Sequence, residues 1–201
     1  MSKIYVTSDF HFGHEKFFIY TARGYQTIQE MNEDLVRKFN SVVSNDDDVY
    51  ILGDLVLGDI GNIEYVRELN GRLHVVLGNH DTNMRAAEYR TSCPNIVEVA
   101  DVGIKLDYGK YHFALTHFPM LTNNIEKEYL KQMTLNLFGH THQTTNFYNN
   151  LPFCYHVGID SHNGYPVLLD DIIQEMKDKI KEPAAAATKP HRDPPDGGFY
   201  G

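Results

Sequence analysis

The sequence predicts a mixed α/β fold, and three observations support this prediction. The first third of the chain alternates short apolar runs with amphipathic helical patterns. The middle alternates apolar and polar residues as strands do, and the last apolar pattern is again helical. At 201 residues, of which 42% are hydrophobic and 22% charged, we expect one domain over residues 1–181. Residues 182–201 are rich in Pro, Ala and Gly and are expected to form a tail, either flexible or packed as an extended arm.

Three short apolar runs predict buried strands, over residues 4–8, 49–52 and 73–77. Between the first two runs, apolar residues recur every three or four positions and predict a helix over residues 28–42. A second helical pattern, over residues 63–69, lies between the second and third runs. This alternation of strand and helix implies right-handed crossovers, and therefore a parallel sheet.

The rest of the domain is expected to contain antiparallel strands and a closing helix. Residues 96–116 alternate around a turn at Tyr108-Gly109-Lys110, which is typical of antiparallel strands or a hairpin. Further strands are expected over residues 135–138 and 155–158, each followed by a polar loop. The apolar spacing over residues 172–180 predicts the closing helix.

The composition limits the classes of function. The formal net charge is −9 and the sequence pI about 5.6, so a groove for non-specific nucleic-acid binding is not expected. A phosphate substrate is still compatible with this charge, because two bound divalent cations would add about four positive charges at the site. No stretch approaches the roughly 18 apolar residues of a membrane span, and we expect neither a signal peptide nor a membrane partner. Cys93 and Cys154 are expected to be buried thiols, which fits a cytoplasmic location.

Polar residues of the kind that bind metals gather at the ends of five apolar runs. They are three Asp, one Asn and five His: Asp9, His11, Asp54, Asn79, His80, Asp81, His117, His140 and His142. Each alone is a weak signal, because capping Asp and surface His residues are common. Together they are expected to meet, since the carboxyl ends of parallel strands converge at one edge of a sheet. Carboxylates with imidazoles suit Mn²⁺, Fe or Zn²⁺, and so many ligands suit two ions about 3.5–4 Å apart.

Five ordered motifs are similar to those of the calcineurin-like metallophosphoesterases. They are Asp9-x-His11, Gly53-Asp54, Gly78-Asn79-His80-Asp81, His117 and Gly139-His140-x-His142. The resemblance runs from residue 4 to about residue 170, and residues 8–14, 30–33, 49–54 and 157–160 resemble more narrowly a branch of small predicted phosphoesterases. It implies a four-layer α/β/β/α sandwich with two central sheets flanked by helices.

The resemblance also implies how these residues divide the chemistry. Seven would be metal ligands: Asp9, His11 and His142 for one ion, Asn79, His117 and His140 for the other, and Asp54 as the bridge between them. A hydroxide bridging the two ions would attack phosphorus in line with the leaving oxygen. His80 would donate a proton to the leaving group or stabilise its charge, with Asp81 orienting the His80 ring. Two divalent transition-metal ions are implied as cofactors, Mn²⁺ first, with Fe, Zn²⁺ and Ni²⁺ as alternatives.

Two further residues are candidates for contact with the substrate phosphate, His14 and Arg23, the latter because a guanidinium matches phosphate oxygens. The leading hypothesis is a hydrolase of phosphate mono- or diesters, with nucleotides or nucleic-acid ends as plausible substrates by analogy. A serine/threonine protein phosphatase is the second hypothesis, and it ranks lower because a short chain leaves little room for docking surfaces. The third is a non-catalytic interaction scaffold, which should have lost ligand residues, whereas this sequence has lost none.

Overall fold

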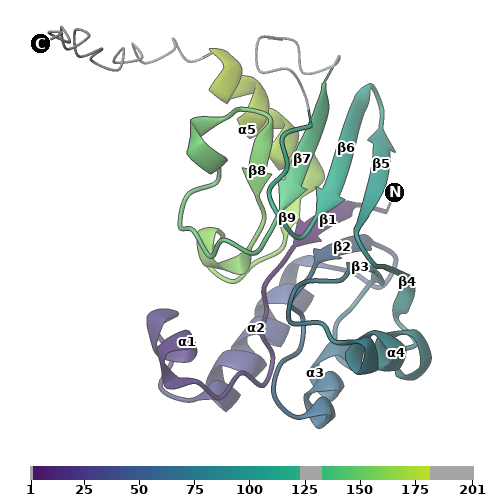
Figure 1. The fold of residues 1–201 in the computed structure, drawn as a ribbon, viewed down its shortest axis with the longest axis vertical. Coiled ribbons are helices and arrows are strands. Elements are labelled where there is room, and N and C mark those ends of the chain that lie inside the picture. Colours follow the sequence, from purple (N-terminus) through teal and green to yellow (C-terminus); the bar gives the residue numbers. More distant parts are fainter. Residues whose placement is uncertain (1, 123–132, 182–201) are drawn as a thin grey trace, which may run out of the picture.

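Two β-sheets lie at the centre of the protein in a computed structural model that describes residues 2–122 and 133–181 (Figure 1). Helices pack against both sheets. The predicted mixed α/β fold with two central sheets is therefore confirmed. The tail predicted over residues 182–201 lies outside the described residues.

The first sheet has five strands in the order β4-β3-β2-β1-β9. They are β1 (Ile4–Thr7), β2 (Asp48–Leu52), β3 (Arg72–Val76), β4 (Ile96–Ala100) and β9 (Val167–Leu168). β1 to β4 run parallel, and β9 runs antiparallel to β1. The register pairs Thr7 with Ile51 and Leu52 with Val76, so β1, β2 and β3 end at the same edge. The predicted parallel core is confirmed.

The second sheet has four strands in the order β5-β6-β7-β8. They are β5 (Gly103–Tyr108), β6 (Tyr111–Thr116), β7 (Thr134–Phe138) and β8 (Cys154–His156). β5 and β6 form the predicted hairpin, and β7 and β8 continue the sheet in parallel with β6. The antiparallel prediction for the whole of residues 96–116 was wrong in one part, because residues 96–100 form β4 and pair in parallel with β3.

Five helices complete the described part of the chain. They are α1 (Phe17–Ala22), α2 (Ile28–Val42), α3 (Glu64–Arg67), α4 (Asn83–Ser92) and α5 (Leu169–Lys181). The predicted helix over residues 28–42 is confirmed, and Thr27 caps its N-terminus with a hydroxyl that accepts a hydrogen bond from the Glu30 N–H. α1 and α4 were not predicted. α1 buries no side chain fully and α4 only Ala86 and Tyr89, so neither shows a clear apolar period.

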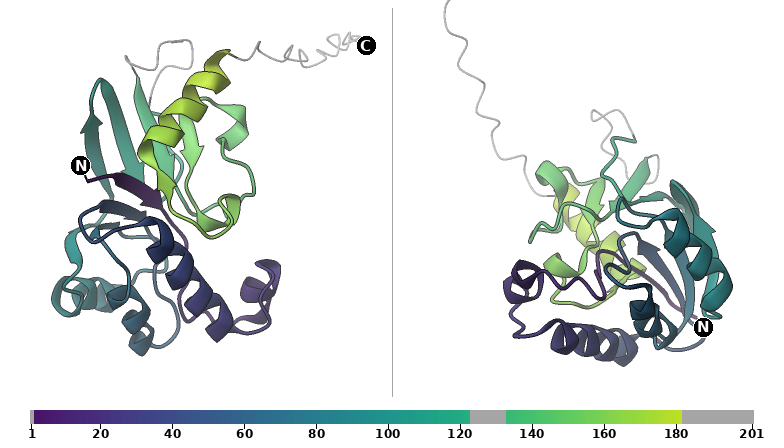
Figure 2. Two further views of the ribbon diagram at one scale, coloured as in Figure 1. Left: turned by 180° about the vertical axis from the view of Figure 1, so that it is seen from behind. Right: turned by 60° about the horizontal axis from the view of Figure 1, so that its bottom comes forward.

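The two faces of the first sheet bury two separate cores. Ile51 and Val75 face α2, α3 and α4, where Phe39 is fully buried. Leu52 and Val76 face the other way and pack with the second sheet and with α5. Figure 2 (left) shows α5 crossing in front of the second sheet. This layering leaves the strand ends free to carry a site.

Cys93 and Cys154 are buried free thiols, as predicted. Among the described residues, no helix has both the length and the apolar character needed to cross a membrane.

Phe39 provides a test of the α2 packing. Phe39→Ala should lower the free energy of unfolding by about 3–5 kcal/mol, because it leaves a cavity among fully buried side chains. Phe17 in α1 is 68% exposed, so Phe17→Ala should change the free energy of unfolding by less than about 0.5 kcal/mol. Urea unfolding of both variants measures the difference, and similar losses would contradict the assigned packing.

Candidate metal centre

The seven predicted ligands come from five loops, each at the carboxyl end of a strand. Asp9 and His11 follow β1, Asp54 follows β2, Asn79 follows β3, His117 follows β6, and His140 and His142 follow β7. Hydrogen bonds join these loops across the two sheets. The Asp9 N–H donates to the Gly53 carbonyl (3.1 Å), and the His140 N–H donates to the Asp9 carboxylate (2.9 Å). The second sheet therefore contributes to the same site as the first.

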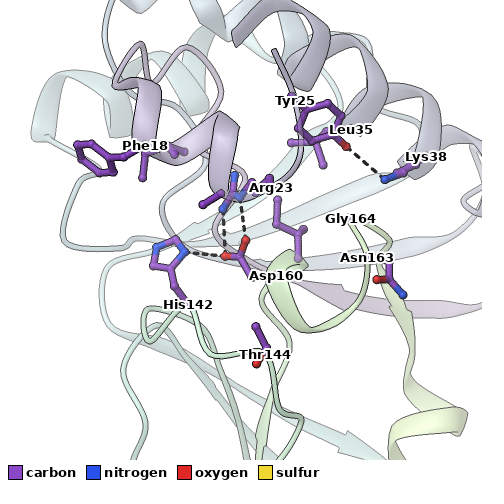
Figure 3. Close-up of a pocket in the computed structure, with 13 residues that line it drawn as sticks. Phe18, Arg23, Tyr25, Leu35, Lys38, His142, Thr144, Asp160, Asn163 and Gly164 are labelled. Atoms are coloured by element: carbon purple, nitrogen blue, oxygen red, sulfur yellow. Dashed lines mark hydrogen bonds and ion pairs between the residues drawn. The ribbon is translucent and has the colours of Figure 1, made fainter. Parts of the chain in front are cut away.

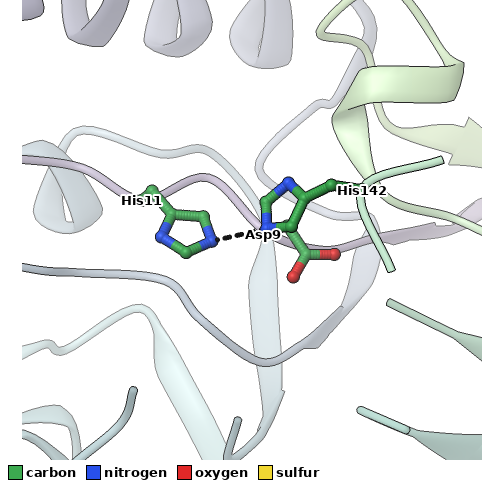
Figure 4. Close-up of side chains that lie close together, drawn as sticks. All are labelled: Asp9, His11 and His142. Atoms are coloured by element: carbon green, nitrogen blue, oxygen red, sulfur yellow. Dashed lines mark hydrogen bonds between the residues drawn. The ribbon is translucent and has the colours of Figure 1, made fainter. Parts of the chain in front are cut away.

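Asp9, His11 and His142 form one group of potential metal ligands (Figure 4). One ligand atom from each lies within 4.8 Å of the others. The Nε2 atoms of His11 and His142 are 3.1 Å apart, although these residues are separated by 131 positions in the chain.

A second group consists of Asp9, Asp54 and His117, again with ligand atoms within 4.8 Å of one another. Asp54 lies between the two groups, because its Oδ2 is 3.7 Å from His11 Nε2 and 3.5 Å from His117 Nε2. Asn79 completes the second group, since its Oδ1 lies 2.8 Å from His117 Nε2 and 2.8 Å from His140 Nδ1. The structure thus brings all seven predicted ligands together.

Hydrogen bonds fix which nitrogen two of the histidines present to the site. His117 Nδ1 lies 2.8 Å from the Leu52 carbonyl, to which it must donate, so Nε2 is left with its lone pair in the neutral ring. His142 Nδ1 lies 2.6 Å from the Asp160 carboxylate, which leaves Nε2 facing His11. A hydrogen bond from the far nitrogen to a carbonyl or carboxylate is the usual support of a metal-binding His.

The backbone around these residues is conformationally strained. Five of the seven have positive φ: Asp9 (63°), His11 (55°), Asp54 (53°), His140 (67°) and His142 (46°). Residues other than Gly rarely adopt such angles, at a cost of about 1–3 kcal/mol each, and they concentrate at functional sites. The sheets hold this conformation in place through the hydrogen bonds between the loops.

Two glycines allow the loops to pack directly against the carboxylates. A Cβ at Gly78 would overlap with Asp54 Oδ1, and a Cβ at Gly139 would overlap with Ser8 Oγ and crowd Asp9 Oδ2. Only glycine permits this close approach of backbone to carboxylate.

The electrostatics of the site suit a bound cation. The carboxylates of Asp9 and Asp54 are buried, and no Lys or Arg in residues 2–122 or 133–181 forms an ion pair with either one. Burial raises the pKa of Asp9 to about 6 and lowers the pKa of His11 to about 2. Buried charges need a partner, and the set of carboxylate oxygens, an amide oxygen and neutral imidazoles fits divalent transition-metal ions.

Residues 2–157 match the family model of the calcineurin-like phosphoesterase superfamily domain. The chain belongs to this superfamily. It is 32% identical over 187 residues to an uncharacterized protein of Methanocaldococcus jannaschii, MJ1445, with 87% of this chain and 91% of that protein aligned. The gene 66 protein of Mycobacterium phage L5 is 27% identical over 163 residues, with 71% of this chain and 78% of that protein aligned.

The fold is shared with a solved structure, a protein of unknown function from Aquifex aeolicus, AQ665. That structure gives a TM-score of 0.66 at 19% identity and covers 87% of this chain and 99% of its own. Membership of the calcineurin-like phosphoesterases supports a metal-dependent phosphoesterase activity for this chain.

Asp81 of this phosphoesterase does not have the partner expected from the sequence. Its carboxylate accepts hydrogen bonds from the N–H groups of Asp54 and Gly78 (both 2.8 Å) and from the Tyr89 hydroxyl (2.8 Å). The prediction that Asp81 orients the His80 ring is corrected accordingly. Asp81 instead holds the loops after β2 and β3 at a fixed spacing, which positions the Asp54 carboxylate.

The His80 ring is 47% exposed at the mouth of the site. The ring Nε2 lies 4.0 Å from Asp54 Oδ2, and the backbone N–H of His80 donates to Asp54 Oδ1 (2.9 Å). The His14 ring stacks on the His11 ring, with 5.5 Å between their centroids. The rings of His80 and His14 can therefore both face a substrate bound at the centre.

Arg23 was expected as a candidate phosphate contact, and the structure assigns its donors elsewhere (Figure 3). Nε and Nη2 donate to the Asp160 carboxylate, at 2.8 and 3.1 Å. Nη2 also donates to the Asp9 carbonyl (2.8 Å), and Nη1 donates to the Phe10 carbonyl and to the Met31 sulfur. These bonds use all five N–H groups of the guanidinium, so Arg23 has none left for phosphate.

Asp160 is the functional residue that sequence reasoning missed. It links Arg23 to His142 and so ties the loop after β1 to the loop after β7. Burial would raise the pKa of Asp160, but its hydrogen bonds to His142 and Arg23 hold that pKa well below its usual range. Burial would likewise lower the pKa of His142, but Asp160 and Asp9 raise it above its ordinary value. The signal in the sequence was Val157-Gly158-Ile159-Asp160, a strand end followed by a carboxylate.

Removal of the Asp160 charge should weaken one metal site. Asp160→Asn should lower the affinity for one of two Mn²⁺ ions by about 10–100-fold, because the His142 ring loses its anionic partner. Calorimetric titration of metal-free protein with Mn²⁺ measures this change. Asp178→Asn is the matched control, since the partners of that exposed carboxylate among the described residues all lie within α5. Identical Mn²⁺ affinities for wild type and Asp160→Asn would contradict the positioning role.

Proposed function

We propose that this protein is a dinuclear metal-dependent hydrolase of phosphate mono- or diesters. The observation that carries the proposal is the position of Asp54, within 3.7 Å of His11 Nε2 on one side and 3.5 Å of His117 Nε2 on the other. A carboxylate in that position can bridge two ions. Two ions held by a shared ligand set are the usual arrangement for in-line displacement at phosphorus.

The ligands divide between two ions in this proposal. Asp9, His11 and His142 would hold the first ion, Asn79, His117 and His140 would hold the second, and Asp54 would be shared between them. The mixed oxygen and nitrogen donors suit Mn²⁺, with Fe, Zn²⁺ and Ni²⁺ as alternatives. When bound, the ions supply Lewis acidity and lower the pKa of water enough to provide a nucleophile at neutral pH.

His80 is the proposed proton donor to the leaving oxygen. Its exposed ring stands beside the ligand cluster but belongs to neither group of ligands. Its backbone N–H donates to the Asp54 carboxylate, which holds the His80 backbone beside the proposed ligands. A positioned acid of this kind contributes about 10²–10⁴ to turnover.

The metal content tests the dinuclear part of the proposal. Protein saturated with Mn²⁺ should hold about two ions per chain, and Asp54→Asn should hold fewer because the bridge loses its charge. Elemental analysis of the folded, desalted protein provides the count. At most one ion per folded wild-type chain would rule out the dinuclear arrangement.

The role of His80 is tested by separating metal binding from proton transfer. His80→Ala should keep its metal content but lose about 10²–10⁴ in turnover on alkyl esters of phosphate. The loss should be smallest for esters of very acidic phenols, which leave without a proton. His117→Ala is the comparison, since loss of a ligand should be partly restored by excess Mn²⁺.

Steady-state rates across a series of leaving groups, together with metal content, decide between these roles. If the loss in His80→Ala were equal for all leaving groups, or were reversed by Mn²⁺, His80 would be a ligand or structural residue rather than an acid.

A further inference from the structure

A cavity of about 550 Å³ adjoins the metal centre on the side of α1 (Figure 3). Its walls come from α1, α2 and the loops after β7 and β8. The volume is within the range of about 300–1,000 Å³ typical of sites that bury small organic ligands. The proposed metal chemistry does not require this cavity, so the cavity itself needs a separate explanation.

The cavity and the metal centre share a side chain. His142 lines the cavity and also presents Nε2 to His11 at 3.1 Å. At the mouth, the Phe18 ring lies 6.3 Å from the His14 ring, which itself stacks on His11. A group attached to a phosphate at the metal centre could therefore extend past the His142 ring into the cavity.

The apolar part of the cavity can hold a flat organic group. Ile19, Leu35 and Ile159 line it, and Phe18 stands at its edge with 57% of the residue exposed. An exposed aromatic ring beside a ligand site offers a surface on which a heterocyclic base can stack.

The polar groups of the cavity favour a neutral ligand that carries both hydrogen-bond donors and acceptors. Asn163 lines the cavity, and its side-chain amide has no hydrogen-bond partner among residues 2–122 and 133–181. An amide can both donate and accept. Lys38 Nζ uses two of its three protons on Tyr25 (3.2 Å) and Asp34 (3.1 Å), which leaves one for a ligand. Arg23 and Asp160 bond each other and offer no free charge to a second phosphate.

We propose that this cavity binds the nucleobase end of a nucleotide ester while the phosphate lies at the metal centre. The substrate class is then nucleoside phosphodiesters, an inference that rests on the phosphoesterase function proposed above. Stacking on Phe18 supplies affinity, and Asn163 and Lys38 bond the edge of the base.

The test compares two substrates with the same leaving group. Thymidine 5′-(p-nitrophenyl phosphate) carries a nucleoside, whereas methyl p-nitrophenyl phosphate carries nothing that can reach the cavity. Wild-type protein with Mn²⁺ should show a kcat/KM ratio between them of at least about 10, equivalent to 1.4 kcal/mol of additional binding. Ala22 lines the cavity from α1 and is exposed, so Ala22→Trp should fill the cavity and bring the ratio close to 1.

Two further variants control this experiment. Thr21→Trp adds the same bulk to α1 at an exposed residue that does not line the cavity, and should keep the wild-type ratio. Asn163→Gly removes the amide without backbone strain, because φ of Asn163 is already 54°, and should lower the ratio by less than Ala22→Trp does. If Ala22→Trp does not fold, Thr144→Trp fills the cavity from the opposite wall.

A binding measurement separates this inference from the phosphoesterase function. Saturation-transfer NMR should detect thymidine on the wild-type protein and lose the signal in Ala22→Trp, whether or not any ester is hydrolysed. An unchanged substrate ratio in Ala22→Trp, or thymidine binding that persists in it, would overturn the cavity assignment. So would a preference of the wild type for a phosphopeptide over the nucleotide ester. Absence of hydrolysis of every ester by fully metal-loaded protein would instead overturn the proposed function.

Discussion

The structure depends on the burial of two carboxylates, Asp9 and Asp54, at the ends of neighbouring parallel strands. Burial opposes their charge, and no Lys or Arg side chain among the described residues forms an ion pair with them. The surrounding side chains are imidazoles and one amide, which bind cations through lone pairs. Parallel pairing of β1 with β2 brings the two carboxylates together, and the second sheet adds His117, His140 and His142.

Two further carboxylates, those of Asp81 and Asp160, position the surrounding loops but are not among the proposed ligands. Asp81 accepts hydrogen bonds from the N–H groups of Asp54, in the loop after β2, and Gly78, in the loop after β3, and the Tyr89 hydroxyl of α4 also donates to it. Asp160 holds the His142 ring and is itself held by Arg23. A metal centre needs ligand positions fixed to fractions of an ångström, and loops alone do not provide this. Through these hydrogen bonds, Asp81 and Asp160 hold the ligand-bearing loops in fixed positions relative to the two sheets and α4.

The apolar runs and the convergence of parallel strands predicted that nine polar residues would meet at one edge, and the family resemblance then implied which seven of them are ligands. It predicted the wrong partner for Asp81 and the wrong contact for Arg23, since both depend on approaches between residues distant in the chain; Arg23 and Asp160 are 137 positions apart. The position of β4 was missed for a related reason: alternation identifies a strand but not the sheet it joins. α1 and α4 were missed because they bury too few side chains to show a period.

The left-handed backbone at five ligand residues connects folding to metal binding. Each such residue destabilises the folded chain, and crowding buried carboxylates together adds to this. Both effects are confined to the folded state, as is the arrangement of ligands that a metal ion would recognise. An ion that binds only the folded chain stabilises it in proportion to the logarithm of its concentration over its Kd. Metal ions bound to these ligands would therefore offset the strain at the strand ends, and stability would then depend on metal occupancy.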